Sequence, residues 1–308
     1  MCMSNRHAEF VASLLQQHEV SDSTFPVFPT PTDDGLAEFI KCCTSAATRT
    51  RKPLSVPIGQ AQHQLLLLQP HPDDIALSVG GILARVLAQL AIITVYANGH
   101  NPEMAGCRRA EDAEFAQLLR ADLLTLNLPE NPSSSPVSNS DLVLHTMRAA
   151  TRQFTGAILL APASVARHPD HRVVQRVAAD LGCGVFWEDV AFWGIYGSCV
   201  DDRVLLCERA DLALDEFTLV AVDISRQIEA KAMMLGCYSS QSTDVWRPLR
   251  YAWTAAREIG APFSYCERLF IHDRHIREVE RVLGASISAA GSLRYGTTDV
   301  RTGWFTEP

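Results

Sequence analysis

The sequence lacks any hydrophobic run long enough to cross a membrane. A helix needs about 20 consecutive apolar residues to span a bilayer, and no segment of the 308 residues approaches that length. The amino terminus also has no apolar core of the kind found in signal peptides. We therefore expect a protein of the cytoplasm without a membrane span.

The cysteines lack the pattern of a disulfide framework. They number nine, which is odd, contain no Cys-x-x-Cys and include the adjacent pair Cys42-Cys43. Secreted disulfide scaffolds use even numbers at regular spacings, so a reducing compartment is favoured. Cys107, Cys183 and Cys237 lie within or beside apolar segments, and we expect them to be small core residues rather than nucleophiles.

Clustered positive charge is scarce. The chain has 27 Lys and Arg against 35 Asp and Glu, a net charge of −8. The one basic cluster, Arg49-Thr50-Arg51-Lys52, is short. Because binding to nucleic-acid phosphates needs grouped Lys and Arg, we expect no nucleic-acid partner.

Two related tetrapeptides, His71-Pro72-Asp73-Asp74 and His168-Pro169-Asp170-His171, are the most informative feature present. At ordinary residue frequencies His-Pro-Asp is expected about 0.02 times in a chain of this length. A single copy is typical of a turn with an Asx cap before a helix. Two copies indicate a site.

Both tetrapeptides are expected between a buried strand and a helix. The apolar runs 64–70 and 157–162 precede them, and helical spacing of apolar residues follows each one. Open α/β sheets bind ligands at the carboxyl ends of their strands. The two loops can therefore meet in space.

The residue types suit a catalytic metal. Neutral His and ionised Asp bind zinc and leave positions open for water, and a nearby carboxylate that is not a ligand can accept the proton of that water. Asp73 and Asp74 supply one carboxylate for each task. In the second motif one imidazole can bind metal while the other faces the reacting carbonyl, and Asp170 can orient an imidazole.

These motifs resemble those of the PIG-L/LmbE-like family of metal-dependent de-N-acetylases, whose signatures are of the Ala-His-Pro-Asp-Asp-Glu and His-Pro-Asp-His types. The resemblance runs from about Gln64 to Phe270. It implies a Rossmann-like fold, a zinc ion and hydrolysis of an acetamide, typically on an amino sugar. Iron or manganese could occupy the same ligands. The resemblance implies that the metal ligands are His71, Asp74 and His171.

The same resemblance implies the catalytic roles. Asp73 would be the general base, and His168 would stabilise the oxyanion or protonate the departing amine. Arg108 resembles a substrate-contacting arginine of the family, with a helical ion pair to Glu111 as the alternative. Glu130 stands where the family has an acid that grips sugar hydroxyls.

Three departures from the family pattern concern the surroundings of the site. Ile75 replaces a common glutamate, Gln69-Pro70 replaces a small residue before the histidine, and Ala166 stands where some amino-sugar deacetylases have tyrosine. Further along, the acids Glu188 and Asp189 lie with Trp187 after a predicted strand. They either line the substrate cleft or, for Trp187, belong to the core.

Alternation of strand and helix patterns after Gln64 predicts an α/β, Rossmann-like three-layer fold with a mainly parallel sheet. We expect a helical and irregular appendage over 1–62, a catalytic domain over 63–272 and a tail over 273–308 that packs on it. The helix predicted after the first tetrapeptide, His71-Pro72-Asp73-Asp74, extends to about Leu90.

The predicted function is a zinc-dependent hydrolase that removes an acyl group, acetyl in the leading hypothesis, from an amino sugar or a small amine-bearing metabolite. Its partner is then a small N-acylated substrate, and a homo-oligomer is left open. One alternative is an inactive binding protein of the same fold. Another is a nucleotide-binding oxidoreductase, which is disfavoured because Gly80-Gly81 replaces the expected Gly-x-Gly-x-x-Gly.

Overall fold

The computed structural model describes residues 64–86, 88–97, 102–128, 130, 140–163, 168–190, 216–240, 246–284, 286–295 and 298–305. The predicted appendage over 1–62 and Ala166 lie outside the described residues. Among the helices that are described, none combines the length and the apolar character needed to cross a membrane.

A nine-stranded sheet forms the centre of the described part, with the order β3-β2-β1-β4-β5-β7-β6-β9-β8. The five strands from β3 to β5 are parallel, and their order is that of a Rossmann half-sheet. The strands are β1 (Gln64–Gln69), β2 (Gln89–Thr94), β3 (Asp122–Thr125), β4 (Ile158–Ala163), β5 (Val185–Glu188), β6 (Phe217–Asp223), β7 (Cys266–His272), β8 (Ile287–Tyr295) and β9 (Thr298–Phe305).

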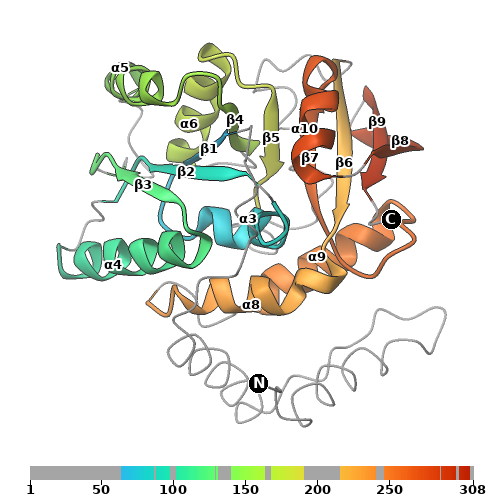
Figure 1. Cartoon of the computed structure of the whole chain (residues 1–308), viewed down its shortest axis with the longest axis horizontal. Coiled ribbons are helices and arrows are strands. Elements are labelled where there is room, and N and C mark those ends of the chain that lie inside the picture. The colour runs from blue at the N-terminus through green and yellow to red at the C-terminus, as the bar shows by residue number, and fades with distance from the viewer. Residues whose placement is uncertain are drawn as a thin grey trace, which may run out of the picture. The chain divides into compact units, whose positions relative to one another are not determined.

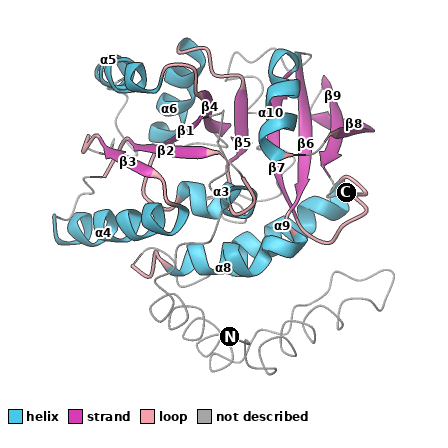
Figure 2. Ribbon diagram, viewed as in Figure 1, coloured by secondary structure: helices cyan, strands magenta, loops and turns pink. Residues whose placement is uncertain are grey.

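Helices cover both faces of this sheet. Figure 1 shows α5 and α6 on one side and α4, α8 and α9 on the other, and Figure 2 shows the same layers by type of element. The predicted three-layer α/β fold is therefore confirmed. The helices are α3 (Asp74–Leu83), α4 (Pro102–Leu119), α5 (Ser140–Thr151), α6 (Pro169–Asp180), α8 (Ile228–Gly236), α9 (Trp246–Glu258) and α10 (Ile276–Leu283), with short 3-10 turns at Arg152–Phe154, Ser225–Gln227 and Asp273–His275.

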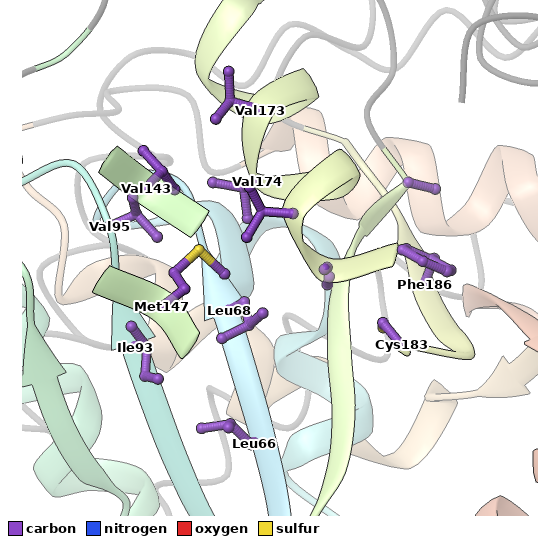
Figure 3. Close-up of a cluster of buried hydrophobic side chains, with 14 of the residues drawn as sticks. Leu66, Leu68, Ile93, Val95, Val143, Met147, Val173, Val174, Cys183 and Phe186 are labelled. Atoms are coloured by element: carbon purple, nitrogen blue, oxygen red, sulfur yellow. The ribbon is translucent and has the colours of Figure 1, made fainter. Parts of the chain in front are cut away.

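The apolar run of β1 is buried on both faces. Leu66 and Leu68 point into the cluster beneath α5 and α6, where they meet Met147 and Val174 (Figure 3). Successive strand residues face opposite sides, so Leu67, which is fully buried, packs on the other layer. A continuous run of leucines is what a central parallel strand requires.

The carboxyl-terminal part of the chain extends the sheet. β7 runs antiparallel to β5 and to β6, and β9 lies parallel to β6. The predicted tail thus supplies both helix α10 and the hairpin β8–β9. Ala, Gly and Ser in β8 disfavour a strand locally, so the pairing of β9 with β6 provides the context that the sequence pattern does not show.

Helix α3 is shorter than predicted and is broken in the middle. It ends at Leu83. Gln89 and Leu90, which were predicted to be helical, instead belong to β2 and pair with β1. Inside it, Val79 has φ −132° and ψ 15°, outside the helical range. The next residue but one, Gly81, lies so close to Ile224 that an added Cβ would be 2.8 Å from its Cδ1 atom. The glycine pair therefore serves close packing.

Replacing Gly81 with alanine is expected to destabilise the protein by about 1–3 kcal/mol, because the new methyl group overpacks against Ile224. Urea unfolding monitored by circular dichroism measures this change. Gly106→Ala in α4 is the matched control, since a Cβ there meets nothing within 4 Å, and it should stabilise by about 0.5–1 kcal/mol. Equal effects of the two substitutions would contradict the packing argument.

Candidate active site

The two histidine motifs meet because their strands are neighbours. β1 and β4 pair in parallel register from Leu65 with Ile158 to Leu67 with Leu160, so their carboxyl ends lie at the same edge of the sheet. This position is the switch point of the Rossmann order, where the chain leaves β1 toward one side and β4 toward the other. His71 follows β1, and His168 is the N-cap of α6 with Pro169 as its first residue.

Three predicted ligand atoms form a compact triangle. His71 Nδ1 lies 3.1 Å from His171 Nε2, and Asp74 Oδ2 lies 3.5 Å from each of these nitrogens. Zinc with bonds of 2.0–2.1 Å in tetrahedral geometry requires ligand atoms about 3.3 Å apart. All three side chains are buried. The spacing and chemistry of this donor set therefore fit a divalent cation.

Each imidazole is held by a carboxylate at the nitrogen that faces away from the triangle. His71 Nε2 donates to Asp170 Oδ2 at 3.0 Å, and His171 Nδ1 hydrogen-bonds Asp189. Such partners fix the ring orientation of metal-binding histidines. Asp189, Asp74 and His171 also lie close enough together to hold a metal ion. Because it faces the other nitrogen of the same His171 ring, we interpret it as a support and not as a ligand.

Asp189 is a residue of this cluster that the sequence pattern did not single out. It follows β5, the strand beside β4 in the sheet, and the sequence placed it only near a possible cleft. The feature of the sequence that could have indicated it is the position of an acidic residue directly after a buried strand. Its neighbour Trp187 is fully buried, so of the two roles considered for Trp187 the structure shows the core role.

The donor set concentrates negative charge and therefore attracts positive charge. Burial lowers the pKa of His71, but hydrogen bonds to Asp170 and Asp74 outweigh it and raise that pKa to about 10. Burial also opposes the charge of His171, yet the Asp189 and Asp74 carboxylates raise its pKa. For Asp74, burial is outweighed by the His171 charge and the His71 hydrogen bonds, and its pKa falls to about 2. In the absence of an ion, protons supply the positive charge.

Asp73 is set apart from Asp74 by its backbone and its surroundings. Its φ is 101° and its ψ −27°, in the left-handed region that non-glycine residues rarely adopt. It is the N-cap of α3, but its side chain makes no capping hydrogen bond, so the simple Asx-cap interpretation does not apply. Burial, followed by the Asp74 charge, raises the pKa of Asp73, whereas the charge of Arg108 lowers it. The carboxylate is thus available for chemistry.

The two residues predicted to bind substrate contact each other. Arg108 Nη1 donates to Glu130 Oε1 at 2.8 Å, with 15% and 16% of the side chains exposed. Glu111, the alternative partner of Arg108, instead accepts hydrogen bonds from Ser239 and from the backbone and hydroxyl of Ser240. The structure therefore brings Arg108 and Glu130 to the same place, close enough to Asp73 for the arginine charge to act on it.

A buried polar network lies behind the site at two of the departures from the family pattern. Gln69 Nε2 donates to Thr94 and to Asp112, both at 2.7 Å, and the Tyr238 hydroxyl donates to Asp112 at 2.9 Å. Gln69 also accepts a bond from the backbone N–H of Ile75 at 3.5 Å. Gln69 thus ties the end of β1 to α4, while the Ile75 side chain is fully buried. Asp112 was not identified from the sequence.

The cysteines of the described residues do not form a nucleophile site. Burial raises the pKa of the Cys183 and Cys237 thiols to about 12, which keeps them protonated. Both are core residues as predicted. Cys107 is exposed on α4, so its prediction as a core residue was wrong. Ala105 is buried on the same helix, whereas Met104 and Cys107 are exposed.

The sequence is similar to a family of known proteins. Residues 66–181 match the PIG-L family, described as GlcNAc-PI de-N-acetylase. All the predicted ligands fall within this match. Residues 66–181 therefore form a PIG-L-like domain. The resemblance predicted from the two tetrapeptides is confirmed.

Individual relatives extend the similarity beyond the PIG-L-like domain. A 2'-N-acetylparomamine deacetylase of Streptomyces fradiae is 29% identical over 220 residues, which cover 61% of this chain and 77% of the relative. A crystal structure of a deacetylase–teicoplanin complex matches with a TM-score of 0.52 and 18% identity, covering 68% of this chain and 97% of that one. The latter similarity establishes the fold.

Binding of Zn²⁺ to the PIG-L-like domain is expected to release protons at pH 7. The imidazoles must be neutral to act as ligands, and the pKa of His71 without metal is about 10. Its proton is therefore bound well above neutrality and must leave, so affinity should rise as the pH increases toward 10. Isothermal titration calorimetry in buffers of different ionisation enthalpy counts the released protons.

Asp170→Asn is the control for this effect. It removes the strongest of the interactions that raise the pKa of His71, so it should reduce the number of protons released at pH 7. Zn²⁺ binding without proton release in the wild-type protein would show that the imidazoles are neutral before the ion arrives.

Proposed function

We propose that this protein is a divalent-metal-dependent hydrolase that removes the acetyl group from the nitrogen of an amino sugar. The observation that carries the proposal is the triangle of His71 Nδ1, Asp74 Oδ2 and His171 Nε2, with edges of 3.1–3.5 Å, beside the carboxylate of Asp73, which makes no capping hydrogen bond to α3. Zinc is the proposed ion. Iron and manganese also bind nitrogen and oxygen donors of this kind.

The comparisons support the enzyme class and the kind of substrate. The family description and the name of the Streptomyces fradiae relative both denote removal of an acetyl group from nitrogen, which is hydrolysis of an amide bond. The relative's name specifies an N-acetylated amino sugar. A small N-acetylated sugar is therefore the substrate class that we assign to this chain.

His71, Asp74 and His171 would hold the ion, which when bound lowers the pKa of water and polarises a carbonyl. Asp73 would accept the proton that a water molecule loses as it attacks the acetamide carbon. Its pKa is raised by burial and by the Asp74 charge, which makes it a stronger base than an exposed aspartate. The protonated Asp73 can then return that proton to the amine nitrogen, and acetate and the free amine leave.

His168 would stabilise the oxyanion as a neutral hydrogen-bond donor. Its ring lies edge-on to His71 and His171, with ring centroids 4.9 and 5.1 Å away. Burial, followed by the charges of those two imidazoles, lowers its pKa to about 4. A neutral imidazole can donate an N–H to the developing oxyanion but has no extra proton to give to the amine. We therefore assign it the first of its two predicted roles.

Arg108 and Glu130 would grip the sugar. Their mutual ion pair at 2.8 Å is partly exposed, so substrate hydroxyls can share its hydrogen bonds without leaving either charge unpaired. The charge of Arg108 also acts on Asp73, which places the grip next to the reacting group. This arrangement orients the acetamide toward the triangle.

Asp73→Asn should lower kcat by about 10²–10⁴-fold, the usual contribution of a general base, and leave bound zinc unchanged. The apoprotein should also melt at a higher temperature, because the repulsion between two adjacent carboxylates is removed. Acetate release and elemental analysis test these outcomes. Asp122→Asn, at the exposed first position of β3, is the control. Full activity of the Asp73 variant would refute the assigned role, and an inactive wild-type protein with zinc bound would favour a binding protein.

Glu130→Gln and Arg108→Met should each raise KM about tenfold or more with a smaller change in kcat, since they remove contacts made equally to ground and transition states. Combining them should cost less than the sum of the single effects, because the residues are partners. Steady-state kinetics with an N-acetylated amino sugar measures this. Arg148→Met on α5, an exposed arginine, serves as the matched control. Additive effects would indicate that the two residues act apart.

A further inference from the structure

A second buried cluster, away from the ligand triangle, contains a charged pair. Lys231 of α8 and Glu267 of β7 are 1% and 2% exposed, and their Nζ and Oε1 atoms are 2.5 Å apart. Both lie beyond residues 66–181, the part that matches the family. Buried Lys and Glu are costly to keep in a core unless they are fully paired. Their contacts indicate what they do there.

Each partner binds the backbone of α3 on one side of its break. Lys231 Nζ donates to the carbonyl oxygens of Ala76 at 3.3 Å and Leu77 at 2.7 Å. Glu267 accepts bonds from the backbone N–H groups of Gly81 at 3.0 Å and Ile82 at 2.7 Å. In a continuous helix the N–H of Gly81 would bond the carbonyl of Leu77. The charged pair thus satisfies backbone groups on both sides of the break at Val79.

The front half of α3 carries the metal-binding aspartate. It begins at Asp74, two residues before Ala76. The hydrogen bonds of Lys231 therefore attach to the first turn of the helix. The Ser78 hydroxyl accepts a bond from the backbone N–H of Val190 at 3.2 Å, and Val190 follows Asp189, which orients His171. The short front segment is thus held from α8 at one point and from the end of β5 at another.

We propose that Lys231 and Glu267 are positioning residues of the metal site, which set the direction of the front half of α3 and thereby place the Asp74 carboxylate against His71 and His171. The inference rests on the proposed function in requiring that the triangle binds a cation. Glu267 anchors the rear half of α3, and Lys231 attaches the front half to that anchor. Loss of the pair lets the front half rotate, which separates Asp74 Oδ2 from the two nitrogens.

Cobalt binding tests this directly, because Co²⁺ reports its coordination through its visible spectrum and needs no turnover. The double variant Lys231→Met with Glu267→Met leaves no lone charge in the core and keeps similar side-chain length. It should bind Co²⁺ at least about tenfold more weakly, the loss typical when residues that orient ligands are removed, and its spectrum should change in intensity. Acetate release should fall through kcat more than through KM.

Leu283→Ala is the control for a merely structural effect. It truncates a buried side chain in α10, outside the contact of α3 with α8 and β7, and lowers the melting temperature without touching α3. Measured well below melting, it should retain the wild-type Co²⁺ affinity and spectrum. If it weakens binding as much as the double variant does, loss of stability and not positioning explains the result.

The possible outcomes separate this inference from the proposed function. His171→Ala should abolish the cobalt spectrum seen with the wild-type protein. If the wild-type protein binds no Co²⁺ through His171, the proposed function is wrong. If the wild-type protein and the double variant bind Co²⁺ equally well, only the positioning role is wrong. If the double variant does not fold, Glu267→Gln decides, since it retains one acceptor and should weaken binding by a smaller factor, and unchanged affinity overturns the inference.

Discussion

The site depends on one constraint, the parallel pairing of β1 with β4. Backbone hydrogen bonds place the ends of these strands side by side, and this pairing brings together His71 and His171 from motifs far apart in the chain. The ligand triangle depends on that proximity. Two imidazoles and a carboxylate within 3.1–3.5 Å of one another crowd polar atoms in a buried place, and the crowding is relieved when a cation or bound protons lie between them.

The difference between the two adjacent carboxylates has an electrostatic cause. Asp74 faces the imidazoles and has a pKa of about 2, whereas Asp73 turns away on a left-handed backbone and has a raised pKa. Residues of one type with pKa values displaced in opposite directions are typical of paired catalytic roles. The backbone strain at Asp73, of the order of 1–3 kcal/mol, keeps the two side chains apart. A relaxed helical N-cap would turn Asp73 toward the backbone of α3.

Features that are local in sequence could be predicted, and features that depend on sheet neighbours could not. The apolar run of β1, the Pro at the start of α6 and the spacing of His168 and His171 identified both loops, and the resemblance to the family implied the donor set. Asp189 supports His171 only because β5 lies beside β4, and nothing near residue 189 indicates that pairing. The end of α3 at Leu83 was missed for a similar reason, because pairing with β1 draws Gln89 and Leu90 into β2 against their helical spacing.

The path of α3 explains why a charged pair occupies the core. Gly81 approaches Ile224 too closely for an unbroken, side-chain-bearing helix, and the break at Val79 separates backbone groups that would otherwise pair. A buried backbone group without a partner costs about 1–3 kcal/mol, which is a large fraction of the net stability of a folded domain. Apolar residues at positions 231 and 267 would remove the hydrogen bonds that the charged pair makes to the backbone of α3. Lys231 and Glu267 meet that demand with long, flexible side chains, and the requirement arises from the path of α3, which must bring Asp74 inward at the end of β1.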